Sequence, residues 1–248
     1  FSMAPGGDLV STMAIDGIDE LTDLESIVAA PNGDVYVLSS QSRSKRGKRP
    51  KARTAFLRLE QKGDSYRVLD ELHLAELLDA AGADAMKALG LGNSTVELEI
   101  EGMAMRDGAI YFGLKAPLDE LGRAMIWRLS SPRALFDGKG LEAAGLTPFA
   151  RVQLDLGGGV ANGGISELLF LKSGALVVAS TPSSGDEAAG AIFRVEKPDA
   201  ASPLATTTIR RFPGRKPEGL ALSLASPDGV VVVFDNGARP GELMELTP

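Results

Sequence analysis

The sequence predicts an all-β fold, a β-propeller of four blades, from a hairpin motif that occurs four times and a further strand that follows each hairpin. The four repeats begin near residues 24, 100, 166 and 217. Each has a glutamate, an apolar run, a turn with Asn-Gly, Asp-Gly or Ser-Gly, and a second apolar run, which is the pattern of a β-hairpin. A third apolar run follows at residues 55–59, 125–129, 191–195 and 242–246. An antiparallel unit repeated in this way around an axis is a propeller.

A fourth strand completes each of the first three repeats, at residues 66–69, 149–156 and 206–212. After the last repeat too few residues remain for a fourth strand. We therefore expect residues 10–15 to pair with residues 242–246, so that an N-terminal strand closes the ring. The result is one domain over residues 1–248, with four blades of four antiparallel strands.

Two insertions separate the repeats, near residues 70–92 and 131–146. The first carries leucines at helical spacing, and the second begins with Ser131-Pro132, a serine at the N-cap and a proline at the first helical position. We expect a small helical segment in each.

Composition limits the chemistry of the chain. Of 248 residues, 44% are hydrophobic and 24% charged, which is typical of a globular protein. No apolar run approaches the roughly 18 residues of a membrane span, so we expect a soluble protein. The absence of cysteine excludes thiolate metal sites and disulfides, and His73 is the one histidine. The sequence leaves the cellular compartment open.

Charge is unevenly distributed. The net charge of −7 argues against a general nucleic-acid binder. Between Arg43 and Arg53, however, lie seven cations and no acid, so the other 237 residues carry −7 − 7 = −14. This basic loop has no interleaved aromatic residues for base stacking. It is either a solvated loop or a site for an anionic ligand or an acidic protein surface.

One glutamate near the start of each repeat forms the candidate site. If the first strand of each repeat is innermost, these glutamates meet at one end of the central channel. The second strand runs antiparallel to the first, so its end lies at the same rim. The predicted metal ligands are Glu25, Glu101, Glu167 and Glu218, and the predicted ligand-binding residues are Arg43, Lys115, Asp235 and Asn236.

Converging carboxylates raise one another's pKa and need compensation. A divalent cation, Ca²⁺ or Mg²⁺, is one solution, with carboxylate oxygens as ligands. Pairing with Lys115 or Arg43 is a second. In the third, the glutamates accept backbone N–H bonds from neighbouring blades and serve the architecture alone. The sequence leaves all three open.

Particular segments resemble a bacterial family of unknown function, the DUF3616 proteins. The most specific is the loop Ser-Arg-Ser-Lys-Arg-Gly-Lys over residues 42–48. The others are Glu25-Ser26-Ile27, then Glu101-Gly102-Met103-Ala104, leading to Gly113–Pro117, and Glu218-Gly219-Leu220-Ala221, leading to Phe234–Gly237. The resemblance covers most of the chain and implies a propeller-like fold, but the family has no established activity to transfer.

For function, the sequence favours a ligand-binding propeller that recognises a small anionic or polar ligand at the channel rim, with or without a divalent cation. One alternative is a metal-dependent hydrolase of phosphate esters or lactones, in which the cation activates water and a glutamate acts as base. Another is a protein-interaction propeller that uses the basic loop. Whether the protein is an enzyme stays open.

Overall fold

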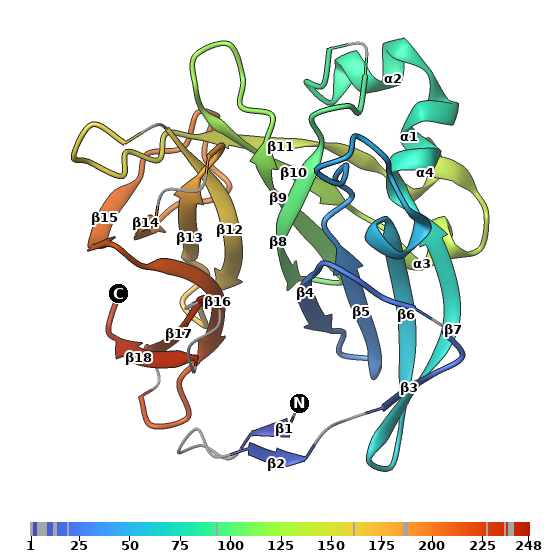
Figure 1. Cartoon of the computed structure of the whole chain (residues 1–248), viewed down its shortest axis with the longest axis horizontal. Coiled ribbons are helices and arrows are strands. Elements are labelled where there is room, and N and C mark those ends of the chain that lie inside the picture. The colour runs from blue at the N-terminus through green and yellow to red at the C-terminus, as the bar shows by residue number, and fades with distance from the viewer. Residues whose placement is uncertain are drawn as a thin grey trace.

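The computed structural model describes residues 2–3, 9–11, 14–18, 20–92, 94–160, 162–185, 188–226, 228–235, 237 and 241–248. The strands of this part form four successive antiparallel blades around an axis (Figure 1). Their inner strands are β4 (Leu24–Ala29), β8 (Glu99–Arg106), β12 (Gly163–Phe170) and β16 (Lys216–Leu222). Each inner strand contacts the next along the series. The predicted four-bladed, all-β propeller fold is therefore confirmed.

The remaining strands of each blade follow outward in chain order. Blade 1 adds β5 (Asp34–Ser39), β6 (Ala55–Lys62) and β7 (Ser65–His73); blade 2 adds β9 (Ala109–Ala116), β10 (Ala124–Leu129) and β11 (Leu146–Val152); blade 3 adds β13 (Leu176–Pro182), β14 (Ala189–Val195) and β15 (Thr207–Pro213); blade 4 adds β17 (Val230–Asp235) and β18 (Glu242–Leu246). The Asp-Gly turn of blade 2 shows why these hairpins form. Asp107 and Gly108 both have positive φ, +53° and +76°, which suits the tight twisted turn between antiparallel strands.

Helices occupy the two predicted insertions. The first holds α1 (Leu74–Ala81) and α2 (Ala83–Ala88), and the second holds α3 (Pro132–Phe136) and α4 (Gly140–Ala144). Leu74 and Leu78 of α1 are fully buried, and the Nε1–H of Trp127 donates to the carbonyl of Leu89 just after α2, at 2.9 Å. Both insertions are thus packed into the domain. Within the described residues, no helix has the length and apolar character needed to cross a membrane.

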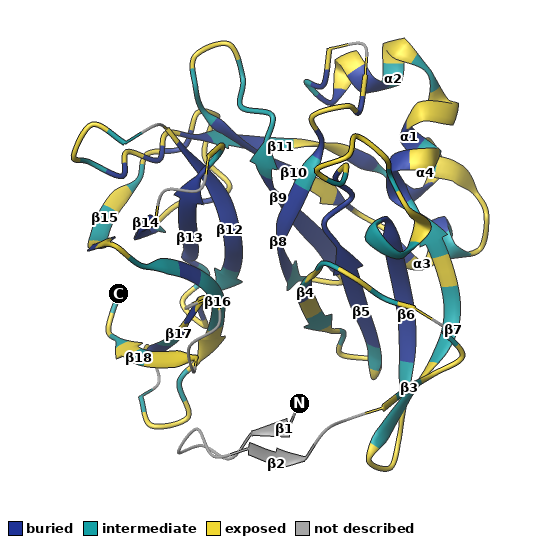
Figure 2. Ribbon diagram, in the orientation of Figure 1, coloured by how far each residue is buried: buried dark blue, intermediate teal, exposed yellow. Residues whose placement is uncertain are grey.

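Three apolar clusters hold neighbouring blades together. Phe56, Phe112 and Trp127 are buried between blades 1 and 2. Ile126 and Phe193 belong to the cluster between blades 2 and 3. A third cluster, with Phe212 and Phe234, joins blades 3 and 4. Figure 2 shows β6 and β9, which carry Phe56 and Phe112, as largely buried.

The fourth cluster lies within blade 1 and explains why the predicted ring closure is wrong. β3 (Ala14–Asp16) pairs in parallel with β7, and β2 (Leu9–Ser11) pairs with β1 (Ser2–Met3). Residues 12–13 of the predicted closing strand lie outside the described residues. Ile15, Ile18 and Leu21 pack over Val35, Val37 and Leu57 on the blade 1 face that blade 2 does not cover. This apolar face accounts for the choice of partner, because packing Ile15, Ile18 and Leu21 over it removes apolar surface from water.

Blade 4 consequently has three strands in the described part of the chain, and no apolar cluster joins it there to blade 1. Its face toward blade 3 is buried, whereas Val233 and Leu243 on the opposite face are 39% and 44% exposed. On blade 1, Leu24 and Ile27 of β4 are also exposed. Among the described residues the blades thus form an arc whose last junction lacks a core.

We predict that Phe56→Ala lowers the free energy of unfolding by about 3–5 kcal/mol, because Phe56 is fully buried against Phe112 and Phe136. The matched control is Leu224→Ala, since Leu224 is 87% exposed and should change stability by less than about 0.5 kcal/mol. Chemical denaturation of both variants measures the difference. Equal effects would contradict the assignment of this core.

Candidate functional site

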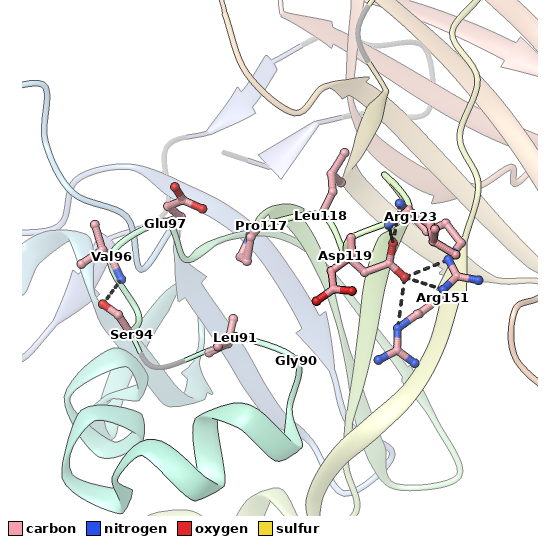
Figure 3. A pocket seen from close by; sticks show the side chains of 13 residues that line it. Gly90, Leu91, Ser94, Val96, Glu97, Pro117, Leu118, Asp119, Arg123 and Arg151 are labelled. Atoms are coloured by element: carbon pink, nitrogen blue, oxygen red, sulfur yellow. Dashed lines mark hydrogen bonds and ion pairs between the residues drawn. The ribbon is translucent and has the colours of Figure 1, made fainter.

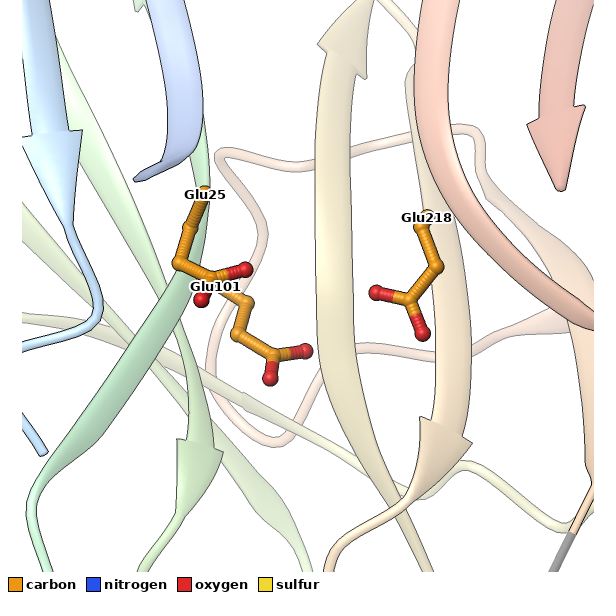
Figure 4. Close-up of side chains that lie close together, drawn as sticks. All are labelled: Glu25, Glu101 and Glu218. Atoms are coloured by element: carbon orange, nitrogen blue, oxygen red, sulfur yellow. The ribbon is translucent and has the colours of Figure 1, made fainter. Parts of the chain in front are cut away.

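A β-bulge at the start of the inner strand places each axial glutamate. In blades 1, 2 and 4 the register between the first two strands skips one residue, and that residue is Glu25, Glu101 or Glu218. A bulged residue leaves the regular alternation of the strand, so its side chain is redirected. In all three blades the bulge directs the carboxylate into the same space between the inner strands (Figure 4).

In blade 3 the skipped residue is Ser166, and Glu167 sits in register opposite Ala179. Glu167 therefore matches Ser26, Gly102 and Gly219, one position later than the other three glutamates. A shift of one residue moves a strand side chain to the other face. The expected equivalence of the four glutamates is wrong in this repeat, and Glu167 does not belong to the axial cluster.

Glu167 instead links three blades through hydrogen bonds. Its Oε1 accepts from the backbone N–H groups of Met103 and Leu168, both at 2.9 Å, and the Ser26 hydroxyl donates to the carboxylate at 3.1 Å. Burial raises the pKa of Glu167 to about 8, although these donors oppose the rise. Gly102 permits this close approach, because a Cβ there would lie 3.1 Å from the Glu167 backbone. Glu167 is thus the architectural glutamate among the four.

The axial cluster consists of Glu25, Glu101 and Glu218. One carboxylate oxygen from each lies within 4.8 Å of the others. Lys115, at the end of β9, donates from Nζ to Glu101 Oε1 at 2.8 Å. Glu101 Oε2 is buried and has no hydrogen-bond partner among the described residues, and Glu101 as a whole is 5% exposed. Three carboxylates and one ammonium group therefore share one end of the channel.

The pKa values of these groups follow from burial and mutual repulsion. Burial, with the charges of Asp23 and Glu218, raises the pKa of Glu25 to about 8. Burial also raises the pKa of Glu101 well above its usual range and raises that of Glu218, while Lys115 opposes both shifts. For Lys115, burial disfavours the charged form, but the carboxylates of Glu101, Glu218 and Glu99 together outweigh it and the pKa rises. The cluster holds more carboxylates than its one ammonium group compensates.

Two acids near the cluster carry no signal in the repeat motif, and the sequence analysis missed them. Asp23 raises the pKa of Glu25, and Glu99, two residues before Glu101, has a raised pKa of its own because of burial. Asp23 adopts a left-handed conformation with φ of +58° and accepts a hydrogen bond from Ser40. The positive φ of Asp23 is unusual for a residue other than glycine, but it is a property of the folded chain and cannot be read from the sequence.

The predicted ligand-binding residues occupy different places. Lys115 is part of the cluster. Arg43 is exposed, donates from Nη1 to the Gly47 carbonyl at 2.9 Å, and lines a hollow of about 440 Å³ together with Asp23 and Glu99. Asp235 is exposed, and its charge contributes to the raised pKa of Glu218. Asn236 lies outside the described residues.

The basic loop is only partly solvated. Arg49 donates to the hydroxyl and carbonyl of Thr95, and its side chain is 11% exposed. Arg53 pairs with Asp23 and donates to the Ser42 hydroxyl at 2.7 Å. A fully solvated loop is therefore wrong for Arg49 and Arg53. The exposed cations of the loop are Arg43, Lys45, Arg46, Lys48 and Lys51.

A second hollow, of about 760 Å³, lies beside the first and is shown in Figure 3. One side is formed by Gly90, Leu91, Gly92, Ser94, Val96 and Glu97. The loop between β9 and β10, with Arg151 of β11, forms the other. On that side Asp119 accepts from Arg123 Nε at 2.8 Å and pairs with Arg151 Nε at 3.2 Å. The two hollows share Val96 and Glu97.

His73 lines neither hollow. Its Nδ1 lies 2.9 Å from the Thr54 hydroxyl, and its Nε2 lies 3.5 Å from Glu71. These contacts indicate a structural role for His73.

Comparison with known proteins supports the fold alone. No protein-family model matches the chain, and no curated protein matches it, so the resemblance to DUF3616 proteins stays a prediction. Among solved structures, the chain is similar to an exo-β-1,3-galactanase from Phanerochaete chrysosporium, with a TM-score of 0.53 and 8% identity over 96% of this chain and 50% of that one. It is also similar to a family 117 glycoside hydrolase from the marine bacterium Zobellia galactanivorans, with a TM-score of 0.51 and 8% identity over 95% and 71% of the two chains. The chain thus spans about half the length of the galactanase.

We predict that Glu25→Gln flattens the pH dependence of stability in the presence of a chelator. The pKa of Glu25 is about 8 in the folded protein and 4.5 in a model peptide, so the folded state binds more protons between these values. The contribution of Glu25 to stability is therefore fully present below about pH 4.5 and is lost as the pH rises toward 8. Glutamine mimics the neutral acid, so the variant should gain melting temperature relative to the wild type at pH 8 and little at pH 5. Glu76→Gln, at an exposed position of α1, is the control; an identical response in that variant would contradict the assignment.

We predict that Glu167→Ala lowers the free energy of unfolding by several kcal/mol, because it leaves the buried N–H of Met103 and hydroxyl of Ser26 without this acceptor, at about 1–3 kcal/mol for each buried group. Glu167→Gln retains one carbonyl acceptor and should recover part of the loss. Chemical denaturation, with Glu76→Ala as control, measures both. If the Glu167→Ala variant were as stable as the wild type, the architectural role assigned to Glu167 would be wrong.

Proposed function

We propose that the end of the channel holds a divalent cation, Ca²⁺ or Mg²⁺, between Glu25, Glu101 and Glu218, and that this site binds a small anionic or polar ligand. The observation that carries the proposal is Glu101 Oε2, a buried carboxylate oxygen without a partner among the described residues, next to two further carboxylates. A buried acceptor left without a partner is costly, and a cation is the partner that also relieves the repulsion.

The charge of the cluster matches a dication. A bound cation favours the ionised form and so opposes the raised pKa values of Glu25 and Glu101. With the cation bound, three ionised carboxylates and Lys115 sum to −3 + 1 = −2. Oxygen ligands suit Ca²⁺ and Mg²⁺, and Ca²⁺ takes six to eight of them. Three carboxylates therefore leave coordination positions for water or for oxygen atoms of a ligand.

The hollow of about 440 Å³ provides the space for that ligand. Asp23 and Glu99, which line it, lie close enough to the cluster to affect its charge. Arg43 and Lys45 line the same hollow and offer donors to an anionic or polar group. The galactanase of similar fold has been solved with β-1,3-galactotriose, which supports a polar ligand for this kind of scaffold.

Calorimetry with Ca²⁺ and with Mg²⁺ tests the cation. We expect the wild type to bind one of them and Glu101→Gln to bind it at least tenfold more weakly, because glutamine keeps the shape but removes the charge. Glu76→Gln should bind as the wild type does. Loss of thermal stability in Glu101→Gln without any cation binding in either protein would support pairing with Lys115 instead.

The second candidate is a metal-dependent hydrolase of phosphate esters or lactones. It is favoured by the raised pKa of Glu25, about 8, beside other carboxylates, because such a group exchanges protons near neutral pH. A bound cation would lower the pKa of its water. The third candidate, docking of an acidic protein surface, has the five exposed cations of the basic loop as its support.

Turnover of p-nitrophenyl phosphate and of a γ-lactone distinguishes the hydrolase from the binding protein. A hydrolase should lose activity with chelator and in Glu25→Gln. Ligand-dependent melting without turnover would identify a binding protein.

A further inference from the structure

We infer that the ligand is an extended, uncharged, hydroxyl-rich chain, an oligosaccharide, which lies in one groove formed by the two hollows. This inference rests on the proposed function, because one end of the chain would sit beside the axial cluster. It narrows the ligand from any anionic or polar molecule to one chemical class.

The shape of the groove favours a long ligand. The hollows of about 760 and 440 Å³ are neighbours, because Val96 and Glu97 line both. In Figure 3, these two residues lie at one side of the larger hollow, and Arg123 and Arg151 lie at the other. Pockets for single small ligands usually measure about 300–1,000 Å³, so the combined space exceeds the needs of one sugar unit.

The charge of the groove favours a neutral ligand. Its lining holds five cations and five acids: Arg43, Lys45, Arg53, Arg123 and Arg151, and Asp23, Glu97, Glu99, Asp119 and Glu120. Several of them are already paired, Arg53 with Asp23, and Arg123 and Arg151 with Asp119. Neither a polyanion nor a polycation gains from a balanced surface of this kind.

The lining also combines apolar surface with fixed polar groups. Val96 and Leu121 are 51% and 69% exposed, and Pro117 and Leu118 also line the larger hollow. Asp119 orients the guanidinium groups of Arg123 and Arg151, so little side-chain freedom remains to be lost on binding. A sugar ring has C–H faces for the apolar residues and hydroxyls for the paired charges. No aromatic residue lines either hollow in the described part of the chain, which disfavours stacked nucleic-acid bases.

A panel of immobilised neutral and acidic oligosaccharides of one to six units, with an acidic peptide beside them, tests the inference. We expect the wild type to bind neutral chains, with affinity that rises with length and then levels off. Arg151→Gln and Leu121→Ser should each weaken this binding at least tenfold. Arg128→Gln, at an exposed position of β10 outside both hollows, is the matched control and should bind as the wild type does.

The inference is overturned if no neutral chain binds, if monosaccharides bind as well as longer chains, or if only acidic sugars or the peptide bind. Calorimetry with Ca²⁺ and Mg²⁺ on the same samples separates this failure from failure of the proposed function. Cation binding without oligosaccharide binding would contradict the oligosaccharide groove and support the cation site. Length-dependent oligosaccharide binding without cation binding would contradict the cation site and support the groove.

Discussion

The Glu167 carboxylate is the interaction on which the arrangement of the inner strands depends. It accepts hydrogen bonds from Ser26 on β4, Met103 on β8 and its neighbour Leu168 on β12, so three blades converge on one side chain. Together with the close-packed apolar clusters, these hydrogen bonds fix how β4, β8 and β12 lie against one another, because a buried acceptor with fixed donors tolerates little displacement. Glu25 lies on β4 beside Ser26, and Glu101 lies on β8 near Met103, so the same alignment positions two of the three axial carboxylates.

The four glutamates show that the cost of burying a carboxylate can be compensated in different ways within one fold. Glu167 is satisfied by donors from the main chain and a serine, and Glu101 by Lys115 on one oxygen alone. Glu25 and Glu218 face the remaining repulsion, with pKa values raised by burial and by their acidic neighbours. The excess of negative charge is thus confined to a small volume, and this confinement makes the end of the channel a candidate site.

The hairpins were predictable because glycine turns and alternating apolar runs are local features. Such features can be recognised in a single sequence without knowledge of the folded structure. The error at Glu167 has the same origin: the repeated pattern of a glutamate before an apolar run groups Glu167 with the other three, whereas the bulge at Ser166 shifts it by one position. Pairing of β3 with β7 depends on which apolar face is left uncovered, which only the assembled blades reveal. Asp23 and Glu99 join the site through proximity in space, and no repeat or motif marks either of them.

Among the described residues, no apolar core joins blade 4 to blade 1. The cluster around Phe212 and Phe234 attaches blade 4 to blade 3, and the cluster around Phe56 and Phe112 attaches blade 1 to blade 2. Glu218 lies on β16 of blade 4, and Glu25 lies on β4 of blade 1. A species that binds both carboxylates connects blade 4 to blade 1 directly. Its binding therefore stabilises the whole domain against unfolding.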